Sequence, residues 1–285
     1  MLGKADLHIH TTASDGSCEP AEIVEFAKSK SLDTISITDH DSIDGYLEAI
    51  EAAEKHDIRL IPGVEITALK DGKEVHVLAY CFDPENSEFR IFLKNQRLAR
   101  LKRMEKILEY LSSNDGIDLT LDEVKAQARS NNVGRPHVAQ ILVKRKFVAS
   151  IAEAFIRYLG QPLIEKIQIT YAPLEEVVSV VASAGGVTSL AHPGPLYTMN
   201  EVEELIGFGI DGIECMHPGH SFSDQTRFTE FAEIRNLLVT GGSDFHGTGR
   251  EYDPYFGIVT LSEQKVNNLI RMARRRKKLK MNIEQ

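Results

Sequence analysis

The chain has 285 residues and the composition of an ordinary globular protein, with 42% hydrophobic and 26% charged residues. Its formal net charge of −9 disfavours non-specific binding to nucleic acid. No apolar run approaches the ~20 residues that a membrane span requires, and no signal region opens the sequence. The length fits one large domain, or one domain that carries an insertion.

Three cysteines, Cys18, Cys81 and Cys215, lie far apart in the sequence and form no Cys-x-x-Cys pair. This spacing suits a reducing compartment and argues against a disulfide framework. We therefore expect a cytoplasmic protein without a membrane partner, and the sequence indicates no stable protein partner.

Polar and apolar residues alternate in the opening segment Asp6-Leu7-His8-Ile9-His10. On a strand, Asp6, His8 and His10 would share one face, while Leu7 and Ile9 would pack behind them. Two imidazoles on one face are typical of a metal site, although two histidines also occur by chance at an exposed strand end. The positions of the other histidines must decide between these interpretations.

Strand and helix signals alternate over most of the chain. We expect strands at 34–38, 59–67, 74–80, 186–192, 212–217 and from 237, and helices from 20 and at 43–56, 174–184, 199–208 and 224–236. This order is typical of an α/β fold with a parallel barrel or sheet. Barrel enzymes carry their chemistry at the carboxyl ends of the strands.

The segment 87–165 lacks this alternation and reads as helices at 88–113, 121–130 and 138–146. We expect a small helical insertion over the active site, with the barrel formed by 1–86 and 166–285. The basic face of the first helix is either solvated surface or a surface that holds an anionic substrate. The basic run 271–280 also has two interpretations: it is either a solvated terminus or a segment that attracts nucleic acid.

A stiff cationic corner, Gly134-Arg135-Pro136-His137, lies inside this insertion. Arginine forks match phosphate oxygens, so Arg135 could contact a substrate phosphate. The alternative is that Arg135 caps a helix or pairs with an acidic residue.

Histidines cluster at the carboxyl ends of the predicted strands. Those at or just beyond a strand end are His10, His40, His192, His217 and His246. The ligand-type side chains at these ends and within the strands are His8, His10, Asp15, His40, Glu65, His76, His192, Asp244 and His246. Nine such groups exceed the needs of one ion and are enough for three, so the sequence predicts a polynuclear site.

Six motifs carry a family resemblance. They are Asp6-Leu7-His8-Ile9-His10, Thr38-Asp39-His40-Asp41, Pro62-Gly63-Val64-Glu65, Glu74-Val75-His76, Ala191-His192-Pro193-Gly194 and Gly242-Ser243-Asp244-Phe245-His246. In this order they resemble the polymerase and histidinol phosphatase (PHP) domain family. The insertion and the Gly-Arg-Pro-His element resemble its TrpH/YciV-type phosphoesterases, which include 3',5'-nucleotide bisphosphate phosphatases and a 5'-to-3' exoribonuclease.

The resemblance implies a distorted (βα)7, TIM-like barrel with three divalent metal ions. It implies a first ion at His8, His10, Glu65 and Asp244, a second at Glu65, His76 and His192, and a third at Asp15, His40 and His246. The resemblance implies histidine as the alternative to Asp15 at this position in other members. A carboxylate here favours Mn²⁺, with Zn²⁺ or Fe²⁺ as alternatives. We expect Asp6, Asp39 and Asp41 to orient histidine ligands.

This set of residues predicts a metal-dependent phosphoric ester hydrolase. Metal ions lower the pKa of bound water, so a metal-bridging hydroxide would attack phosphorus while Arg135 neutralises the phosphate oxygens. His137, His217 and His220 are candidates for contacting phosphate or protonating the leaving group, or are surface or supporting histidines.

The expected substrate is the phosphomonoester of a small nucleotide, such as a 3',5'-bisphosphate. The alternatives are 5'-to-3' hydrolysis of short RNA and a histidinol-phosphate-type phosphatase. A further alternative, outside enzymes, is a metal-bound scaffold or proofreading module.

Overall fold

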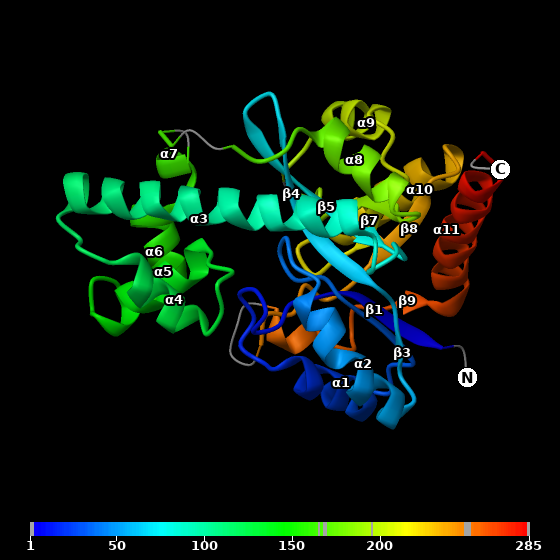
Figure 1. Ribbon diagram of the computed structural model, residues 1–285, viewed down its shortest axis with the longest axis horizontal. Helices are drawn as coiled ribbons and strands as arrows, with labels where there is room; N and C mark the ends of the chain where they lie inside the picture. Colours follow the sequence, from blue (N-terminus) through cyan, green and yellow to red (C-terminus); the bar gives the residue numbers. More distant parts are fainter. Residues whose placement is uncertain (1–2, 165, 168–169, 195, 248–251, 284–285) are drawn as a thin grey trace.

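Two β-sheets lie at the centre of the molecule, and helices surround them (Figure 1). The computed structural model describes residues 3–164, 166–167, 170–194, 196–247 and 252–283. The strands of the first sheet are β1 (Lys4–Ile9), β2 (Thr34–Ile37), β3 (Arg59–Leu60) and β9 (Leu261–Ser262). Their order is β3-β2-β1-β9, with β9 antiparallel to β1 and the other pairs parallel.

The second sheet contains two antiparallel pairs. Its strands, in spatial order, are β4 (Gly63–Lys70), β5 (Lys73–Tyr80), β6 (Val187–Leu190), β7 (Gly212–Met216) and β8 (Leu238–Gly241). The pairs β4–β5 and β5–β6 are antiparallel, and β6–β7 and β7–β8 are parallel. A tight turn with positive φ at Asp71 and Gly72 joins β4 to β5, which makes this pair a hairpin.

The expected (βα)7 barrel is not confirmed, although the α/β class is. Within the described residues the two sheets do not close into one ladder; they meet at isolated bridges that pair Ile9 with Phe245 and His40 with Glu65. The β4–β5 hairpin interrupts the parallel order, because a two-residue turn can only return the chain antiparallel. The single strand expected over 59–67 is also wrong, since β3 and β4 belong to different sheets.

Amphipathic helices cover the sheets. They are α1 (Pro20–Ser29), α2 (Asp44–His56), α8 (Leu174–Ser183), α9 (Met199–Gly207), α10 (Phe222–Ile234) and α11 (Glu263–Ile283). The apolar faces of α8 to α11 pack on strand residues such as Leu7, Val77 and Ile213. Helices α1 and α2 pack in a separate cluster with Ile9 and Ile35. In the part of the chain that the structure describes, no helix combines the length and apolarity needed to cross a membrane.

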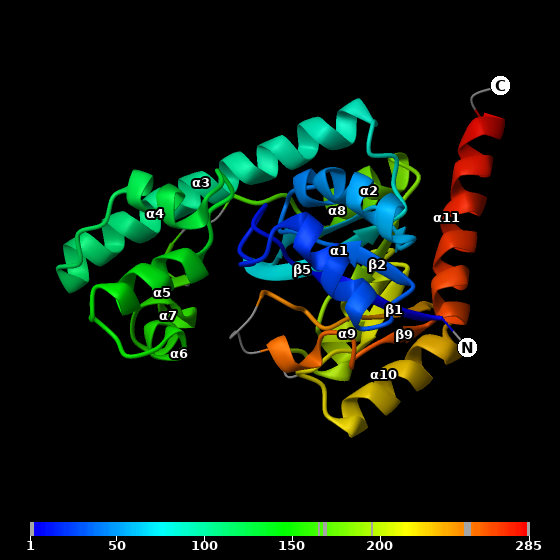
Figure 2. The same cartoon turned by 90° about the horizontal axis from the view of Figure 1, so that it is seen from below.

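The segment between β5 and β6 is helical. It contains α3 (Ser87–Asp115), α4 (Leu121–Ala128), α5 (Arg135–Lys144), α6 (Ile151–Ala154), a π-helical turn (Phe155–Leu159) and α7 (Gln161–Ile164). The start of α3 packs into the main core through Phe89 and Leu93, whereas Ile107 and Leu111 pack with the shorter helices in a separate cluster. Figures 1 and 2 show α3 running from the sheets to this group.

Helix α5 begins at Arg135, three residues earlier than expected. Gly134 is extended at the N-cap and Pro136 occupies the first turn, where its missing N–H costs nothing. Arg135 therefore starts a helix instead of lying in a free corner.

Candidate metal centre

The nine side chains predicted as metal ligands converge where the two sheets meet. His8 lies on β1, Glu65 on β4 and His76 on β5. The others, except Asp15, lie within five residues after a strand end: His10 after β1, His40 after β2, His192 after β6, and Asp244 and His246 after β8. Asp15 lies on the loop that leaves β1. Each of the nine has a ring nitrogen or carboxylate oxygen within 4 Å of such an atom in at least one other, and these contacts form a continuous network.

Glu65 is the centre of this network, and it is almost completely buried. Its two oxygens lie 2.9–3.4 Å from ring nitrogens of His8, His10, His40, His76 and His192. Burial alone raises the pKa of Glu65, but the surrounding histidines, first His40 and His76, hold that pKa well below its usual value. Glu65 is thus a carboxylate shared by five imidazoles.

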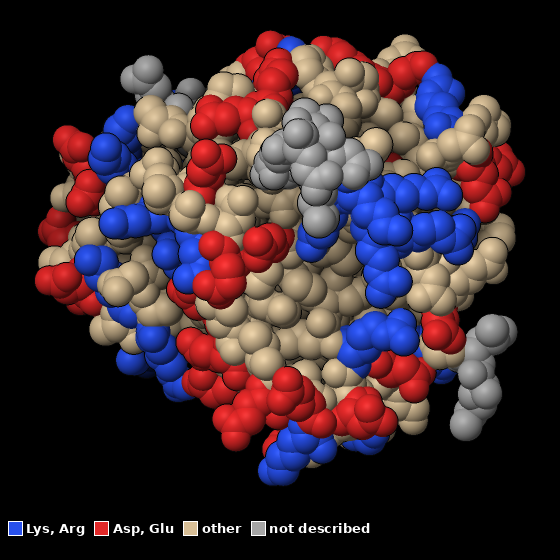
Figure 3. Space-filling model, turned by 45° about the vertical axis from the view of Figure 1, so that its right-hand side comes forward, with Lys and Arg blue, Asp and Glu red and all other residues tan. Residues whose placement is uncertain are grey.

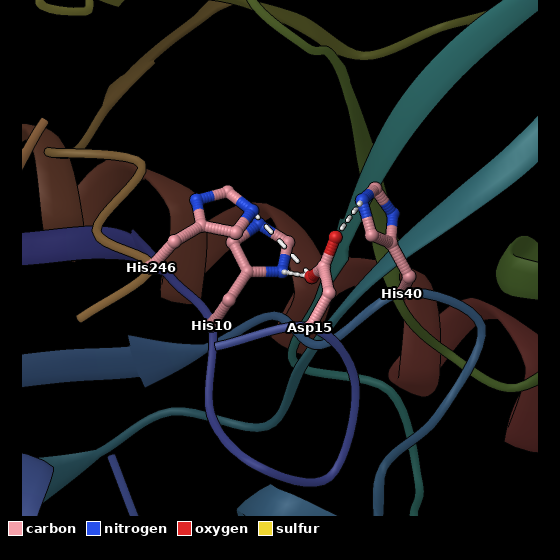
Figure 4. Close-up of side chains that lie close together, drawn as sticks. All are labelled: His10, Asp15, His40 and His246. Carbon is pink, nitrogen blue, oxygen red and sulfur yellow. Dashed lines mark ion pairs between the residues drawn. The ribbon is translucent and has the colours of Figure 1, made fainter. Parts of the chain in front are cut away.

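Asp15 gathers a second group of histidines (Figure 4). Its Oδ1 lies 3.7 Å from His10 Nδ1 and 3.5 Å from His246 Nε2, and its Oδ2 lies 3.8 Å from His40 Nε2. His246 stacks on His10 with 4.1 Å between the ring centroids. One ligand atom from each of these four residues lies within 4.8 Å of the others, a spacing that suits one cation.

Two further groups share ligands with the first. They are His8, His10 and Glu65, and His40, Glu65 and His76. His192 also reaches Glu65, with Nε2 2.9 Å from Oε1, and Asp244 Oδ1 lies 3.2 Å from Nε2 of both His8 and His10. His40 and His10 each touch two groups, so the assignment of ligands to individual ions stays a prediction.

The protonation pattern fits cations in these groups. Glu214 only accepts hydrogen bonds when ionised, so His8 Nδ1, 2.9 Å from Glu214 Oε1, carries the proton. The other nitrogen of a neutral His8 then directs a lone pair at His10 Nε2 and at Asp244 Oδ1, both 3.2 Å away. An unprotonated ring nitrogen that faces the Asp244 carboxylate in a buried pocket suits a divalent ion bound by imidazole and carboxylate.

Three other histidines support the same conclusion. His246 donates from Nδ1 to the Asp244 carbonyl oxygen at 2.8 Å, which leaves Nε2 free to face Asp15. The buried Nδ1 atoms of His40 and His76 have no hydrogen-bond partner and face Glu65. The donor set therefore fits the metal ions that the sequence predicts.

Comparison with known proteins identifies the family. The model of the PHP domain matches residues 6–162. A 5'-3' exoribonuclease of Haemophilus influenzae is 34% identical over 252 residues, which cover 86% of this chain and 91% of the relative. The chain belongs to the PHP domain family.

Two further relatives agree. A 3',5'-nucleoside bisphosphate phosphatase of Chromobacterium violaceum is 31% identical over 87% of this chain and 89% of its own length. The crystal structure of a candidate metal-dependent phosphoesterase from Bifidobacterium adolescentis superposes with a TM-score of 0.84 at 33% identity, covering 94% of this chain and 96% of that one. The predictions of the PHP family and of a metal-dependent phosphoesterase are confirmed.

Backbone strain accompanies the PHP site. Asp41, His192 and Asp244 all have positive φ, at 51°, 29° and 52°. Such conformations are costly for residues other than glycine and concentrate at functional sites. At Gly242 a Cβ would lie 2.3 Å from the His8 nitrogen, so only glycine lets the loop after β8 press against β1.

The three aspartates expected to orient histidine rings contact other groups in this PHP domain. Asp6 Oδ1 accepts hydrogen bonds from the backbone N–H of Ser243 at 2.9 Å and of His8 at 3.3 Å, and burial raises the pKa of Asp6 to about 7. Asp39 holds the loop before Asp15: its oxygens accept from the Thr11 N–H and hydroxyl, each at 2.7 Å. These carboxylates position backbone segments that carry predicted metal ligands.

Asp41 connects the site to the helical segment. Its Oδ1 accepts from the Thr67 N–H at 2.9 Å, and its Oδ2 accepts from Nε and Nη2 of Arg100 on α3 at 3.0 and 2.7 Å. Asn132 adds a second connection, because its side-chain amide donates to the carbonyl oxygen of His40 at 2.5 Å. The helices thereby fix the loop that presents His40.

Glu214, on β7, is a functional residue that the sequence reasoning missed. Besides the His8 contact, its Oε2 accepts from the His192 N–H at 2.7 Å, and the side chain is completely buried. The sequence does contain a signal for Glu214, because it is an ionisable residue between apolar residues of a predicted strand. A charge buried in this way requires a partner. In the sequence, the same strand instead indicates His217, at its end, as the candidate residue.

The predicted substrate residues occupy different positions. His217 lies in the cluster, with Nε2 3.3 Å from Asp244 Oδ2 and Nδ1 accepting from the Gly219 N–H. Both ring nitrogens of His220 bond to backbone, to the Cys215 carbonyl and to the Gly194 N–H, each at 3.0 Å. His137 is buried, and its Nδ1 accepts from the Gly134 N–H at 2.9 Å.

Arg135 and Arg103 form a cationic wall beside His76. Arg103 contacts Glu74, which shares a strand face with His76, and Nη2 of Arg135 lies 3.8 Å from Glu74 Oε2. Burial and the neighbouring arginines lower the pKa of Arg135 to about 10, so the guanidinium is charged at neutral pH. One acidic residue thus faces two guanidinium groups, which leaves an excess of positive charge.

Proposed function

We propose that this PHP domain hydrolyses the phosphomonoester of a small nucleotide, such as a 3',5'-nucleoside bisphosphate, with water as the acceptor. The observation that carries this proposal is the carboxylate of Glu65 surrounded by five imidazoles, with the wall of Arg103 and Arg135 beside it. A nucleotide bisphosphate matches a site that has both a metal-binding cluster and a separate cationic wall. The Chromobacterium violaceum relative is named for this reaction.

We propose that the nine clustered residues hold three divalent ions, with Mn²⁺ favoured because Asp15 contributes a hard carboxylate. Zn²⁺ and Fe²⁺ are alternatives. When bound, such ions supply an activated water at neutral pH and neutralise the charge of a phosphoryl group. Seven of the nine residues, all except His192 and Asp244, form three overlapping groups with ligand atoms within 4.8 Å of one another, which supports this number.

Residues of the chain itself position the substrate. Arg135 donates to the Leu159 carbonyl at 3.2 Å, and a guanidinium has further N–H donors for phosphate oxygens. We assign His217 as the candidate proton donor to the leaving group, because its Nε2 faces the cluster. His220 is less suited, because backbone groups engage both of its nitrogens.

The helical segment 87–165 borders this site and, in this proposal, is the insertion domain that helps to enclose the substrate. Its separate hydrophobic cluster and its contacts through Arg100 and Asn132 support that division of the chain. The cytoplasmic location expected from the sequence belongs to the same proposal.

Phosphate release in the presence of Mn²⁺ tests the proposal. We expect turnover of adenosine 3',5'-bisphosphate to exceed that of histidinol phosphate and of a 5'-phosphorylated RNA trimer, compared as kcat/KM. Turnover of the trimer above the bisphosphate would replace the proposal with the exoribonuclease. If none of the three substrates is turned over with Mn²⁺, Zn²⁺ or Fe²⁺, the proposal fails and the metal-bound scaffold remains as the interpretation.

The exoribonuclease is the second candidate function. The observation that favours it is the 34% identity with the Haemophilus influenzae relative, which carries that name. A terminal phosphate on a short RNA presents the same chemical groups as a nucleotide bisphosphate, so both substrates would use one site.

Arg135→Gln tests the cationic wall. We expect the variant to keep its metal content but to raise KM for the bisphosphate about tenfold, since a charge-assisted hydrogen bond contributes about 1.5–3 kcal/mol. Arg145→Gln, at the other end of α5 and paired with Glu123 on the surface, is the matched control. Unchanged kinetics in Arg135→Gln would remove this residue from the substrate site.

A further inference from the structure

The C-terminal helix α11 carries a basic stripe that the metal centre does not use. Arg271, Arg274, Arg275 and Lys278 are exposed and lie at positions i, i+3, i+4 and i+7, which places them along one side of the helix. At 1.5 Å per residue the stripe is about 10 Å long. A chain with a net charge of −9 thus concentrates four cations on one exposed surface.

The neighbouring basic residues of α11 serve the fold, whereas those of the stripe do not. Arg276 points to the other side and forms two hydrogen bonds with the carboxylate of Asp211 at 2.6 and 2.9 Å, and Lys277 lies against Gly185. Among the residues that the structure describes, none of the four stripe residues has an ion-pair partner. Their charges therefore remain available to an external anion.

The surface around the stripe limits where an anion can bind. A hollow of about 480 Å³ lies beside it, lined by Arg59, Asn267, Ile270, Arg271 and Arg274. The neighbouring hollow shares Arg59 but mixes both signs of charge, because Asp33, Glu54, Asp57 and Glu263 line it together with Lys4 and Lys28. Figure 3 turns this side of the molecule forward and shows a group of Lys and Arg side chains there, with acidic groups around it.

This surface is remote from the metal centre. Arg276 and Lys277 contact the chain just before β6 and β7, whereas His192 and His217 follow these strands at their other ends. Figures 1 and 2 agree that α11 and the helical segment α3–α7 lie on opposite sides of the sheets. A ligand on the stripe would leave the catalytic cluster open.

We propose that the stripe, together with Arg59, binds the phosphate backbone of single-stranded RNA. Arginine supplies four of the five cations, and its fork matches phosphate oxygens. About 10 Å covers roughly three nucleotides of a stacked strand with a 3.4 Å rise. The surface would hold RNA without reading its sequence, since α11 contains no aromatic residue for base stacking.

Two other kinds of partner fit the surface less well. Membrane-surface helices need a broad apolar face, but the apolar residues Val266, Leu269 and Ala273 of α11 are buried against the sheets. Protein interfaces usually centre on buried aromatic and apolar anchors, which the stripe lacks. A flexible polyanion requires only the charges.

Fluorescence anisotropy with a labelled 20-nucleotide uridine oligomer tests the proposal. Phosphorothioate linkages make the oligomer resistant to hydrolysis, so the result does not depend on the proposed phosphatase activity. The test variant replaces Arg271, Arg274, Arg275 and Lys278 with glutamine. The control variant replaces Lys55, Lys102, Lys144 and Lys146, exposed lysines on other surfaces, and causes the same change in net charge.

We expect the test variant to bind the oligomer at least tenfold more weakly at low salt. We also expect the slope of log Kd against log salt to fall by about 2, at ~0.7 for each of roughly three phosphate contacts. The control variant should keep near wild-type values, and both should retain bisphosphate turnover. The proposal is overturned if wild-type protein does not bind the oligomer, or if the two variants lose affinity equally. Stripe-dependent capture by phosphatidylserine vesicles without RNA binding would also overturn it.

Discussion

Glu65→Gln is expected to abolish most of the phosphoesterase activity, lowering kcat/KM by at least about 1000-fold, the size of effect seen when a central charged group of an active site is removed. Glutamine keeps the shape of the side chain but loses the charge and one of the two acceptor oxygens. Five histidine rings lie within 3.4 Å of the Glu65 carboxylate. The change therefore affects the first and second proposed ions directly, and the third, proposed at Asp15, His40 and His246, through His40. The measurements are steady-state kinetics and metal content by mass spectrometry.

Controls separate this effect from misfolding. Glu51→Gln, on the exposed side of α2, removes the same charge and should leave kinetics and metal content unchanged. Asp244→Ala tests the same cluster from a different loop and should also lose bound metal and activity. Full metal content and unchanged turnover in both Glu65→Gln and Asp244→Ala would contradict the proposed metal centre.

The sequence predicted which side chains meet because local rules decide that part of the site. The period of two places His8 and His10 on one face of β1, and strand ends bring distant residues such as His192 and Asp244 to the same edge. Neither rule says which ligands share an ion. His40 has one nitrogen on Glu65 and the other on Asp15, and this arrangement depends on how two separate sheets approach each other.

The residues that support the predicted ligands were harder to predict, because their contacts also depend on how distant segments pack together. Asp41 holds Arg100 across 59 residues of sequence, and Glu214 meets His8 across 206. Such pairs leave no local pattern, and arginines spaced along α3 look like a solvated face until the chain is folded. The fold itself was predicted in its α/β class, but one tight turn at Asp71 and Gly72 was enough to reverse β5 and to break the expected barrel order.

Glu214→Gln is expected to weaken metal binding by about 10- to 100-fold, the range found when a residue that orients a ligand is changed. Glu214 accepts one hydrogen bond from His8 Nδ1–H and one from the His192 backbone N–H, so it positions proposed ligands from two different strands. A glutamine side chain has one acceptor oxygen and presents N–H groups at the other position. One of the two hydrogen bonds must then be lost. The variant loses either the bond that fixes the His8 tautomer or the bond that holds the strained His192 backbone.

Titration of the metal-free protein with Mn²⁺ or Zn²⁺ measures this effect directly, without relying on activity. Glu230→Gln, exposed on the helix that follows β7, is the matched control and should keep wild-type affinity. If Glu214 supported only the fold, the variant would melt at a lower temperature but bind metal normally once folded. Normal metal affinity in folded Glu214→Gln would therefore show that the ligands hold their orientation without this carboxylate, and that the positioning assigned to it is wrong.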